Sequence, residues 1–166
     1  MTNKPIRLFI TGGTIDCVYY RPKTDEWKFR ETFIPKMLKQ ARVTYPVVAE
    51  KLMLKDSRGI TDKDRGLILK RCKKCREDKI VITHGTFTMV ETARFLGSKI
   101  KNKTIILVGS MVPFNEKNSD ALFNLGCAIT AVQVLTKGTY VTMNGKIFLW
   151  NNVRKNIKLG KFEELK

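Results

Sequence analysis

Two short apolar runs, each ending in threonine beside glycine, constrain the fold of this chain more than any other feature. The first run, from Ile6 to Thr11, continues as Gly12-Gly13-Thr14, and the second, from Ile80 to Thr83, continues as His84-Gly85-Thr86. Unbroken apolar runs of this length are typical of strands covered on both faces in a parallel sheet. Ligands of such sheets bind outside the carboxyl ends of the strands. We therefore expect the hydroxyls of Thr14 and Thr86 to face one cavity.

Strand-like and helix-like segments alternate along the chain. The pattern predicts strands over 6–11, 47–54, 80–83, 104–108 and 139–143, and helices over 33–41, 62–75, 88–96 and 120–135. Residues 17–31 are polar and aromatic and are predicted to form a loop, whereas helix 120–135 is apolar all round and is expected to be well buried. The alternation predicts a three-layer α/β/α sandwich with a mostly parallel, Rossmann-like sheet. Asn144-Gly145 between two apolar runs predicts a C-terminal β-hairpin.

Length and hydropathy favour a single domain. A chain of 166 residues with 43% hydrophobic content can bury one core, so we expect one domain over 1–166 and no second domain. No apolar run is long enough to cross a bilayer, which argues against a membrane partner. The residues from Met1 to Lys4 lead directly into the first strand, without the pattern of a secretory signal. The sequence therefore predicts a cytoplasmic protein.

The chain is strongly basic. It carries 32 Lys and Arg against 15 Asp and Glu, a formal net charge of +17, and such a field attracts anionic partners. The basic residues gather in 70–76, 99–103 and 154–161, but no nucleic-acid motif or aromatic interleaving accompanies them. We interpret them as a solvated basic face. A nucleic acid or another acidic partner is the alternative.

Cys72 and Cys75 form a Cys-x-x-Cys pair without a second pair or a nearby histidine. A zinc site requires more ligands at suitable spacing. Because Ile68, Cys72 and Cys75 recur at helical spacing, we interpret the pair as part of a buried stripe rather than as a metal or redox motif.

Several further motifs lie at the same predicted sheet edge, and together they resemble the N-terminal domain of the bacterial-type L-asparaginases. The matching stretches, in family order, are Thr11-Gly12-Gly13-Thr14-Ile15-Asp16, Asp56-Ser57, Val81-Ile82-Thr83-His84-Gly85-Thr86, Thr88-Met89-Val90-Glu91-Thr92-Ala93, Val108-Gly109-Ser110-Met111-Val112-Pro113, Asn118-Ser119-Asp120-Ala121 and Phe123-Asn124. They cover almost the whole chain. It looks most like the short, single-domain members of the family.

The resemblance implies an amidohydrolase that converts L-asparagine, or a related small amide, and water into the acid and ammonia without a cofactor or metal. It assigns Thr14 as the nucleophile and Thr86 to a second catalytic group. It assigns Ser57 and Gly85 to substrate binding, with Phe87 beside them. Amide hydrolysis through a covalent intermediate fits such hydroxyls, provided that a neighbour takes up the proton. Because family members act as oligomers, the resemblance also implies a homo-oligomer.

The sequence departs from the family pattern at three places. Phe87 stands where the family has an aspartate that binds the α-ammonium of the substrate. The catalytic lysine has no clear counterpart, since Val134 falls at the aligned position and Lys137 is the nearest lysine. Trp27 stands near the place where the family has a loop tyrosine that activates the nucleophile. The alternative function is therefore a catalytically impaired member that binds an acidic partner.

Each candidate residue also has a purely structural interpretation. Thr14 and Thr86 are both placed to cap a turn or a helix, and capping by Thr86 is compatible with contact to substrate. We expect His84, at the end of a buried strand, to be a hydrogen-bonded structural residue. The sequence leaves open whether Asp16 orients the loop beside Thr14 or acts on the substrate.

Overall fold

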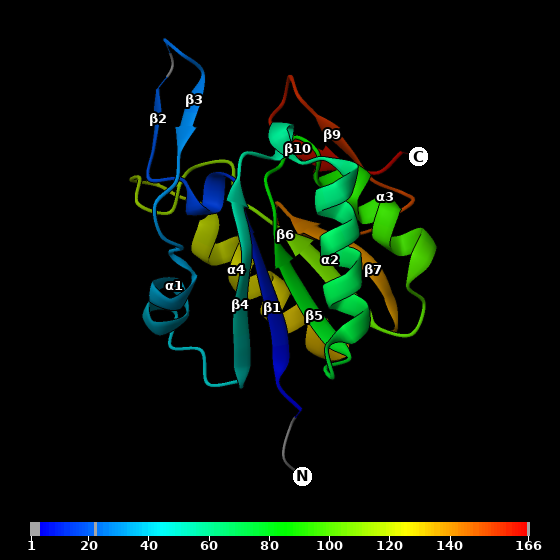
Figure 1. The fold of residues 1–166 in the computed structure, drawn as a ribbon. Helices are drawn as coiled ribbons and strands as arrows, with labels where there is room; N and C mark the ends of the chain where they lie inside the picture. Colours follow the sequence, from blue (N-terminus) through cyan, green and yellow to red (C-terminus); the bar gives the residue numbers. More distant parts are fainter. Residues whose placement is uncertain (1–3, 22, 166) are drawn as a thin grey trace.

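Five parallel strands and one antiparallel edge strand form the central sheet of the computed structural model, which describes residues 4–21 and 23–165 (Figure 1). The strand order is β4-β1-β5-β6-β7-β8. The strands are β1 (Ile6–Gly12), β4 (Val47–Lys55), β5 (Lys79–Thr83), β6 (Thr104–Val108), β7 (Gly138–Met143) and β8 (Lys146–Leu149). The predicted strands are all present. The prediction that the chain has no signal sequence rests partly on residues 1–3, which lie outside the described residues.

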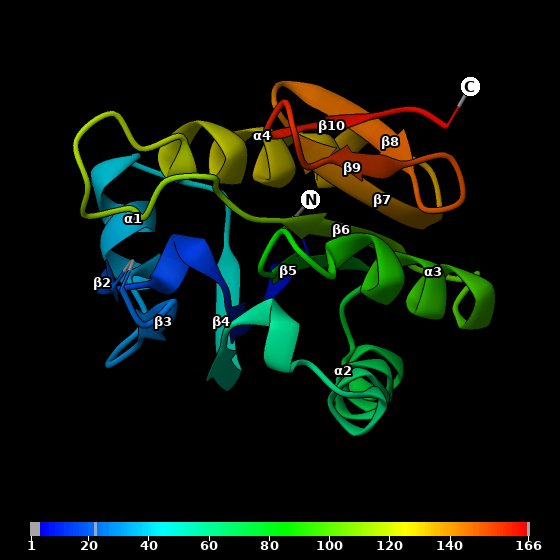
Figure 2. The same ribbon diagram turned by 90° about the horizontal axis from the view of Figure 1, so that it is seen from above.

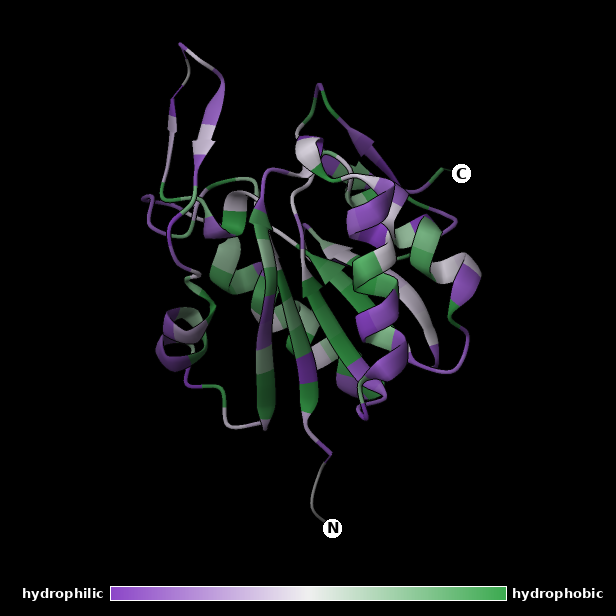
Figure 3. Ribbon diagram, in the orientation of Figure 1, coloured by the Kyte–Doolittle hydropathy of each residue, from purple (hydrophilic) through white to green (hydrophobic). Residues whose placement is uncertain are grey.

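Helices cover both faces of this sheet, as Figure 2 shows from above. Helices α2 (Asp62–Lys74) and α3 (Met89–Lys99) pack on one face, and α1 (Ile34–Gln40) and α4 (Ala121–Val134) pack on the other. Alternation along the strands explains how both faces are filled: Phe9 and Ile82 belong to the first core, and Leu8 and Val81 to the second. The predicted three-layer α/β/α sandwich is confirmed. The central strands β5 and β6 are correspondingly mostly hydrophobic (green) in Figure 3.

Local sequence signals set the ends of several elements. Thr61 and Asp64 form a capping box at the start of α2, with Thr61 N donating to Asp64 Oδ2 at 2.9 Å. The β7–β8 hairpin turns at Asn144 and Gly145, whose φ values of 56° and 72° suit a tight two-residue turn. The predicted C-terminal hairpin is therefore present.

Three expectations from the sequence need correction. The segment 17–31 is not only a loop, because β2 (Tyr19–Arg21) and β3 (Glu26–Lys28) pair in a small antiparallel sheet above the carboxyl edge of the main sheet (Figure 1). A second unpredicted pair, β9 (Arg154–Asn156) and β10 (Lys161–Glu163), follows β8. Helix α4 is buried on one side only, since Phe123 is 60% and Val134 78% exposed.

The positions of Cys72 and Cys75 agree with the interpretation that they belong to a buried stripe. Ile68 and Cys72 are fully buried in the core beneath α2, and Cys75 packs against it. Burial raises the pKa of the Cys72 thiol to about 12. In the described part of the chain, no helix is long and apolar enough to cross a membrane.

Candidate active site

Three segments that follow strand ends meet at the carboxyl edge of the sheet. Thr14 begins a 3-10 turn, η1 (Thr14–Asp16), after β1, and Ser57 begins η2 (Ser57–Gly59) after β4. Residues 84–88 follow β5. The ends of β1 and β5 are joined directly, because Thr11 Oγ1 donates to the carbonyl of Thr83 at 2.6 Å. Parallel pairing thus brings together motifs that are far apart in the sequence.

Two glycines allow these segments to approach closely. Gly13 has φ 83° and ψ −179°, a region that is nearly exclusive to glycine. A Cβ atom on Gly13 would lie 2.3 Å from the backbone nitrogen of Gly85, and one on Gly85 would lie 2.6 Å from Ser57 Oγ. Both positions are therefore closed to any side chain, and Gly85 contributes its backbone to the site.

Ser57 fixes the segment that carries Thr86 and Phe87. Its hydroxyl oxygen accepts hydrogen bonds from the backbone nitrogens of Phe87 at 3.2 Å and Thr88 at 3.4 Å. The hydroxyl of Thr88 donates to the Ser57 carbonyl at 2.7 Å. Since a serine hydroxyl has one hydrogen besides its two acceptor sites, Ser57 keeps a donor for a ligand.

The predicted site residues line one cavity. It is small, with room of only about 10 Å³ for a water-sized sphere. Its walls are Gly13, Thr14, Trp27, Phe29, Asp56, Ser57, Gly85, Thr86 and Phe87. The structure therefore brings together Thr14, Ser57, Gly85, Thr86 and Phe87, as expected from the strand-end motifs.

A lysine that the sequence analysis missed reaches this site. Lys155 Nζ donates a hydrogen bond to Thr86 Oγ1 at 2.7 Å. The resemblance aligned Val134 with the family's lysine and left Lys137 as the nearest lysine, but the lysine that contacts Thr86 is Lys155. Lys155 lies on β9, which follows these two positions in the chain.

The position of Lys155 depends on the small sheet formed by β9 and β10. Lys155 lies opposite Phe162, whose ring is buried in the core. The Phe162 nitrogen donates to Asn144 Oδ1 at 2.9 Å, which ties this sheet to the β7–β8 turn. Burial of the half-buried Lys155 lowers the pKa of its ammonium group. Among the described residues, no carboxylate forms an ion pair with it.

Phe87 brings an aromatic ring to the cavity between two basic side chains. Lys155 Nζ lies 4.2 Å from the centroid of the ring, and Arg58 Cζ lies 5.1 Å from it. Both distances are in the range of cation–π contacts. The ring is 44% exposed, so one part of it faces solvent or a ligand.

The β2–β3 hairpin covers the opening from above. Trp27, on β3, lines the cavity and stacks on Tyr20 with ring centroids 4.4 Å apart. Arg58 holds the hairpin through an ion pair with Asp25. The hydroxyl of Tyr20 donates to Asp25 at 2.8 Å, so it is directed away from Thr14 towards the hairpin turn. Trp27, and not a tyrosine, therefore closes this side of the cavity.

His84 and Asp16 have structural partners next to the site. His84 Nδ1 donates to the Gly85 carbonyl at 2.8 Å, so its Nε2 accepts from the Thr92 hydroxyl at 2.9 Å. Burial lowers the pKa of His84 to about 4, which keeps the ring neutral near pH 7. Asp16 Oδ1 accepts from the hydroxyl of Thr32 and the nitrogen of Phe33, both at 2.8 Å, and burial raises its pKa to about 6. Asp16 thus connects η1 to the start of α1.

One carboxylate, Asp120, and one amide, Asn124, hold the neighbouring loop after β6. Asp120 accepts hydrogen bonds from the backbone nitrogens of Met111 at 2.9 Å and Val112 at 3.0 Å. Asn124 Nδ2 donates to the Gly109 carbonyl at 3.1 Å and to Asp120 at 2.7 Å. The Asn118-Ser119-Asp120 motif therefore shapes this edge of the sheet through backbone contacts.

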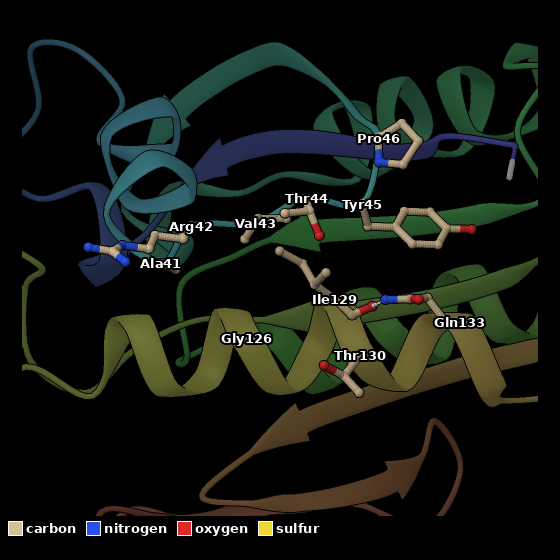
Figure 4. A pocket seen from close by; sticks show the side chains of 10 residues that line it. All are labelled: Ala41, Arg42, Val43, Thr44, Tyr45, Pro46, Gly126, Ile129, Thr130 and Gln133. Carbon is tan, nitrogen blue, oxygen red and sulfur yellow. Dashed lines mark hydrogen bonds between the residues drawn. The ribbon is translucent and has the colours of Figure 1, made fainter. Parts of the chain in front are cut away.

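Larger cavities lie elsewhere and contain none of the predicted site residues. One of about 490 Å³ lies between the segment 41–46 and α4, where Tyr45 and Gln133 line it (Figure 4). Another, of about 620 Å³, is an apolar groove between α4 and the β7–β8 hairpin. Among the described residues, no cluster of three or more His, Cys, Asp or Glu is placed to hold a metal ion.

The fold and the cavity place this protein among α/β proteins that carry a ligand site at the carboxyl edge of a parallel sheet. A family model described as "Asparaginase, N-terminal" matches residues 5–160, and the chain belongs to the asparaginase family.

Relatives of known sequence agree with this membership. L-asparaginase 2 of Bacillus subtilis is 31% identical over 157 residues, which are 86% of this chain and 41% of that protein. The L-asparaginase of Thermococcus kodakarensis is 45% identical over 85 residues, which are 50% of this chain and 26% of that protein.

Solved structures show the same fold. The Thermococcus kodakarensis L-asparaginase has a TM-score of 0.84 at 29% identity, over 97% of this chain and 51% of that one. A probable cytoplasmic L-asparaginase from Campylobacter jejuni has a TM-score of 0.81 at 29% identity, over 98% of this chain and 52% of that one. This chain therefore spans about half the length of the solved structures that it matches.

Proposed function

We propose that the chain hydrolyses the side-chain amide of L-asparagine, or of a related small amide, with Thr14 as the nucleophile. The observation that supports this most directly is the 2.7 Å hydrogen bond that Lys155 donates to Thr86, which lines the same cavity as Thr14. Membership of the asparaginase family supports the reaction class. A cytoplasmic location and assembly into a homo-oligomer stay predictions.

In the first half of the proposed reaction, Thr14 Oγ forms a bond to the amide carbon, and its proton passes to the leaving nitrogen. The carbon–nitrogen bond breaks, ammonia leaves, and an ester on Thr14 remains. In the second half, water adds to the ester carbon, the bond to Thr14 breaks, and the proton returns to Thr14. The products are the free acid and ammonia.

The pair formed by Thr86 and Lys155 supplies the proton transfer in this proposal. Burial destabilises the charged form of Lys155, and no carboxylate partner restores it. The amine is therefore a better proton acceptor than a solvated lysine, and the Thr86 hydroxyl is in position to relay protons between it and the reacting groups. Ser57 contributes its unused hydroxyl hydrogen to the substrate carboxylate, and Gly85, which has no side chain, lets Ser57 approach the site closely.

The test measures ammonia release from asparagine, glutamine and a small panel of primary amides. Thr14→Ala, Thr86→Val and Lys155→Met should each lower turnover by about 100-fold or more, the usual scale for loss of a nucleophile or a proton-transfer group. Lys158→Met is the matched control, because Lys158 is exposed on the loop between β9 and β10. Turnover by Thr14→Ala equal to that of the unaltered protein would exclude Thr14 as the nucleophile.

A second candidate function is binding of an acidic partner by a catalytically impaired member of the family. The formal charge of +17 and the ring of Phe87 in the cavity favour it. Titration with a single-stranded oligonucleotide and with heparin over a salt series tests it, because binding through several phosphate contacts weakens steeply with salt. Loss of all binding at physiological salt, together with ammonia release, would rule this function out.

A further inference from the structure

We propose that this site selects amides without an ammonium group on the carbon beside the carboxylate, and that Phe87 sets this preference. The substrate class is the monoamides of short dicarboxylic acids, such as succinamic acid, which is asparagine without its amino group. The inference rests on the proposed function for the reaction itself, but the preference is a property of binding and is tested separately from turnover.

Among the described residues, the lining of the cavity offers no free carboxylate to an ammonium group. Asp56 is the carboxylate among its lining residues, and it is already held by Arg58. Arg58 Nε donates to Asp56 Oδ2 at 2.9 Å, and its backbone nitrogen donates to Asp56 Oδ1 at 3.0 Å. Asp25, at the turn of the β2–β3 hairpin, is paired with the same Arg58 guanidinium. An ammonium group in this cavity would therefore lie unpaired, which is unfavourable when it loses water.

The aromatic ring of Phe87 already has two cations beside it. The faces of an aromatic ring attract positive charge, so Phe87 alone would attract an ammonium group. Lys155 and Arg58 already lie 4.2 and 5.1 Å from its centroid. A third positive charge beside the ring is repelled by both. A methylene group in the same place instead gains apolar contact with the ring.

The carboxylate that such an amide keeps has two partners next to the cavity. Ser57 has a free hydroxyl hydrogen, and Lys155 has no carboxylate partner among the described residues. A ligand carboxylate is therefore the complementary group for this side of the cavity.

The experiment compares the product acids, since succinate and aspartate differ only in the ammonium group. Isothermal titration calorimetry on the unaltered chain and on Thr14→Ala should show succinate binding about tenfold more tightly than aspartate. Phe87→Asp should reverse the order, because it introduces a carboxylate for the ammonium group. Phe87→Leu should keep the order, because it leaves the position apolar. Phe123→Asp is the control for adding an acid at an exposed phenylalanine that does not line the cavity.

The outcomes separate this inference from the proposed function. Equal or tighter binding of aspartate by the unaltered chain, binding of neither acid, or an unchanged order in folded Phe87→Asp overturns the preference. Ammonia release from asparagine in preference to succinamic acid also overturns it, while the hydrolase proposal stands. A preference for succinate without ammonia release from any amide supports the inference and excludes the proposed hydrolase function. Circular dichroism verifies that each variant is folded. If Phe87→Asp does not fold, the test rests on Phe87→Leu, in which a lost preference for succinate would overturn the inference.

Discussion

Replacing Gly13 by alanine should disrupt the meeting of the strand ends on which the site depends. The backbone of Gly13 lies in a region that costs other residues about 1–3 kcal/mol. The added Cβ would also lie 2.3 Å from Gly85 N and 2.7 Å from the carbonyl carbon of His84, and neither backbone atom is free to rotate away. Overpacking of this kind costs about 1–3 kcal/mol more. The two costs together predict a loss of about 2–6 kcal/mol.

Urea unfolding followed by circular dichroism measures this loss. With a slope of about 1–3 kcal/mol per molar urea, the midpoint should fall by at least about 0.7 M. The matched control is Gly66→Ala within α2, where a Cβ meets no atom within 4 Å. Alanine is preferred to glycine inside helices by about 0.5–1 kcal/mol, so this variant should gain stability. A Gly13→Ala variant as stable as the unaltered chain would refute this expectation.

Three further outcomes follow from buried groups. Asn124→Ala should lose about 1–3 kcal/mol in the same urea assay, because the Gly109 carbonyl loses its buried donor; a neutral result would contradict this. Asp16, whose pKa in the folded state is raised to about 6, stabilises the fold below pH 4 and loses that contribution as the pH rises through 6. His84, whose pKa is lowered to about 4, stabilises the fold above pH 6.5 and loses its contribution as the pH falls through 4. The two oppose each other, so Asp16→Asn should make stability fall more steeply between pH 6.5 and 4 in a pH series of melts; an unchanged slope would contradict this. Cys72 should resist alkylation by iodoacetamide in the folded state and react in urea, because its thiol is buried with a pKa of about 12; rapid labelling of the native protein, read by mass spectrometry, would show otherwise.

The parts of the fold predicted correctly from the sequence are those with local signals. The runs that became β5 and β6 are apolar enough to identify strands buried on both faces. The capping box at Thr61 and the turn at Asn144-Gly145 likewise depend on a few adjacent residues. Predictions failed where short strands lack a periodic pattern. The pairs β2–β3 and β9–β10 have three residues in each strand, too few to show alternation.

The buried face of α4 shows a different limit of sequence reasoning. Its apolar residues surround the helix, so the sequence predicted burial on every side. The structure covers the side that carries Leu125 and leaves Phe123 exposed along the apolar groove. Composition records how hydrophobic a helix is, but only its neighbours decide which side they cover.

By itself, the sequence determined that Thr14, Ser57 and Thr86 follow strand ends, and parallel pairing brings such ends to one edge regardless of the loops between them. Only the tertiary structure decided that Lys155 joins them. Its hydrogen bond to Thr86 spans 69 residues and depends on β9 and β10 folding back, with Phe162 as their anchor in the core. No local pattern encodes a contact of this kind, because its geometry is set by the packing of elements whose separation in the chain is unrelated to their separation in space.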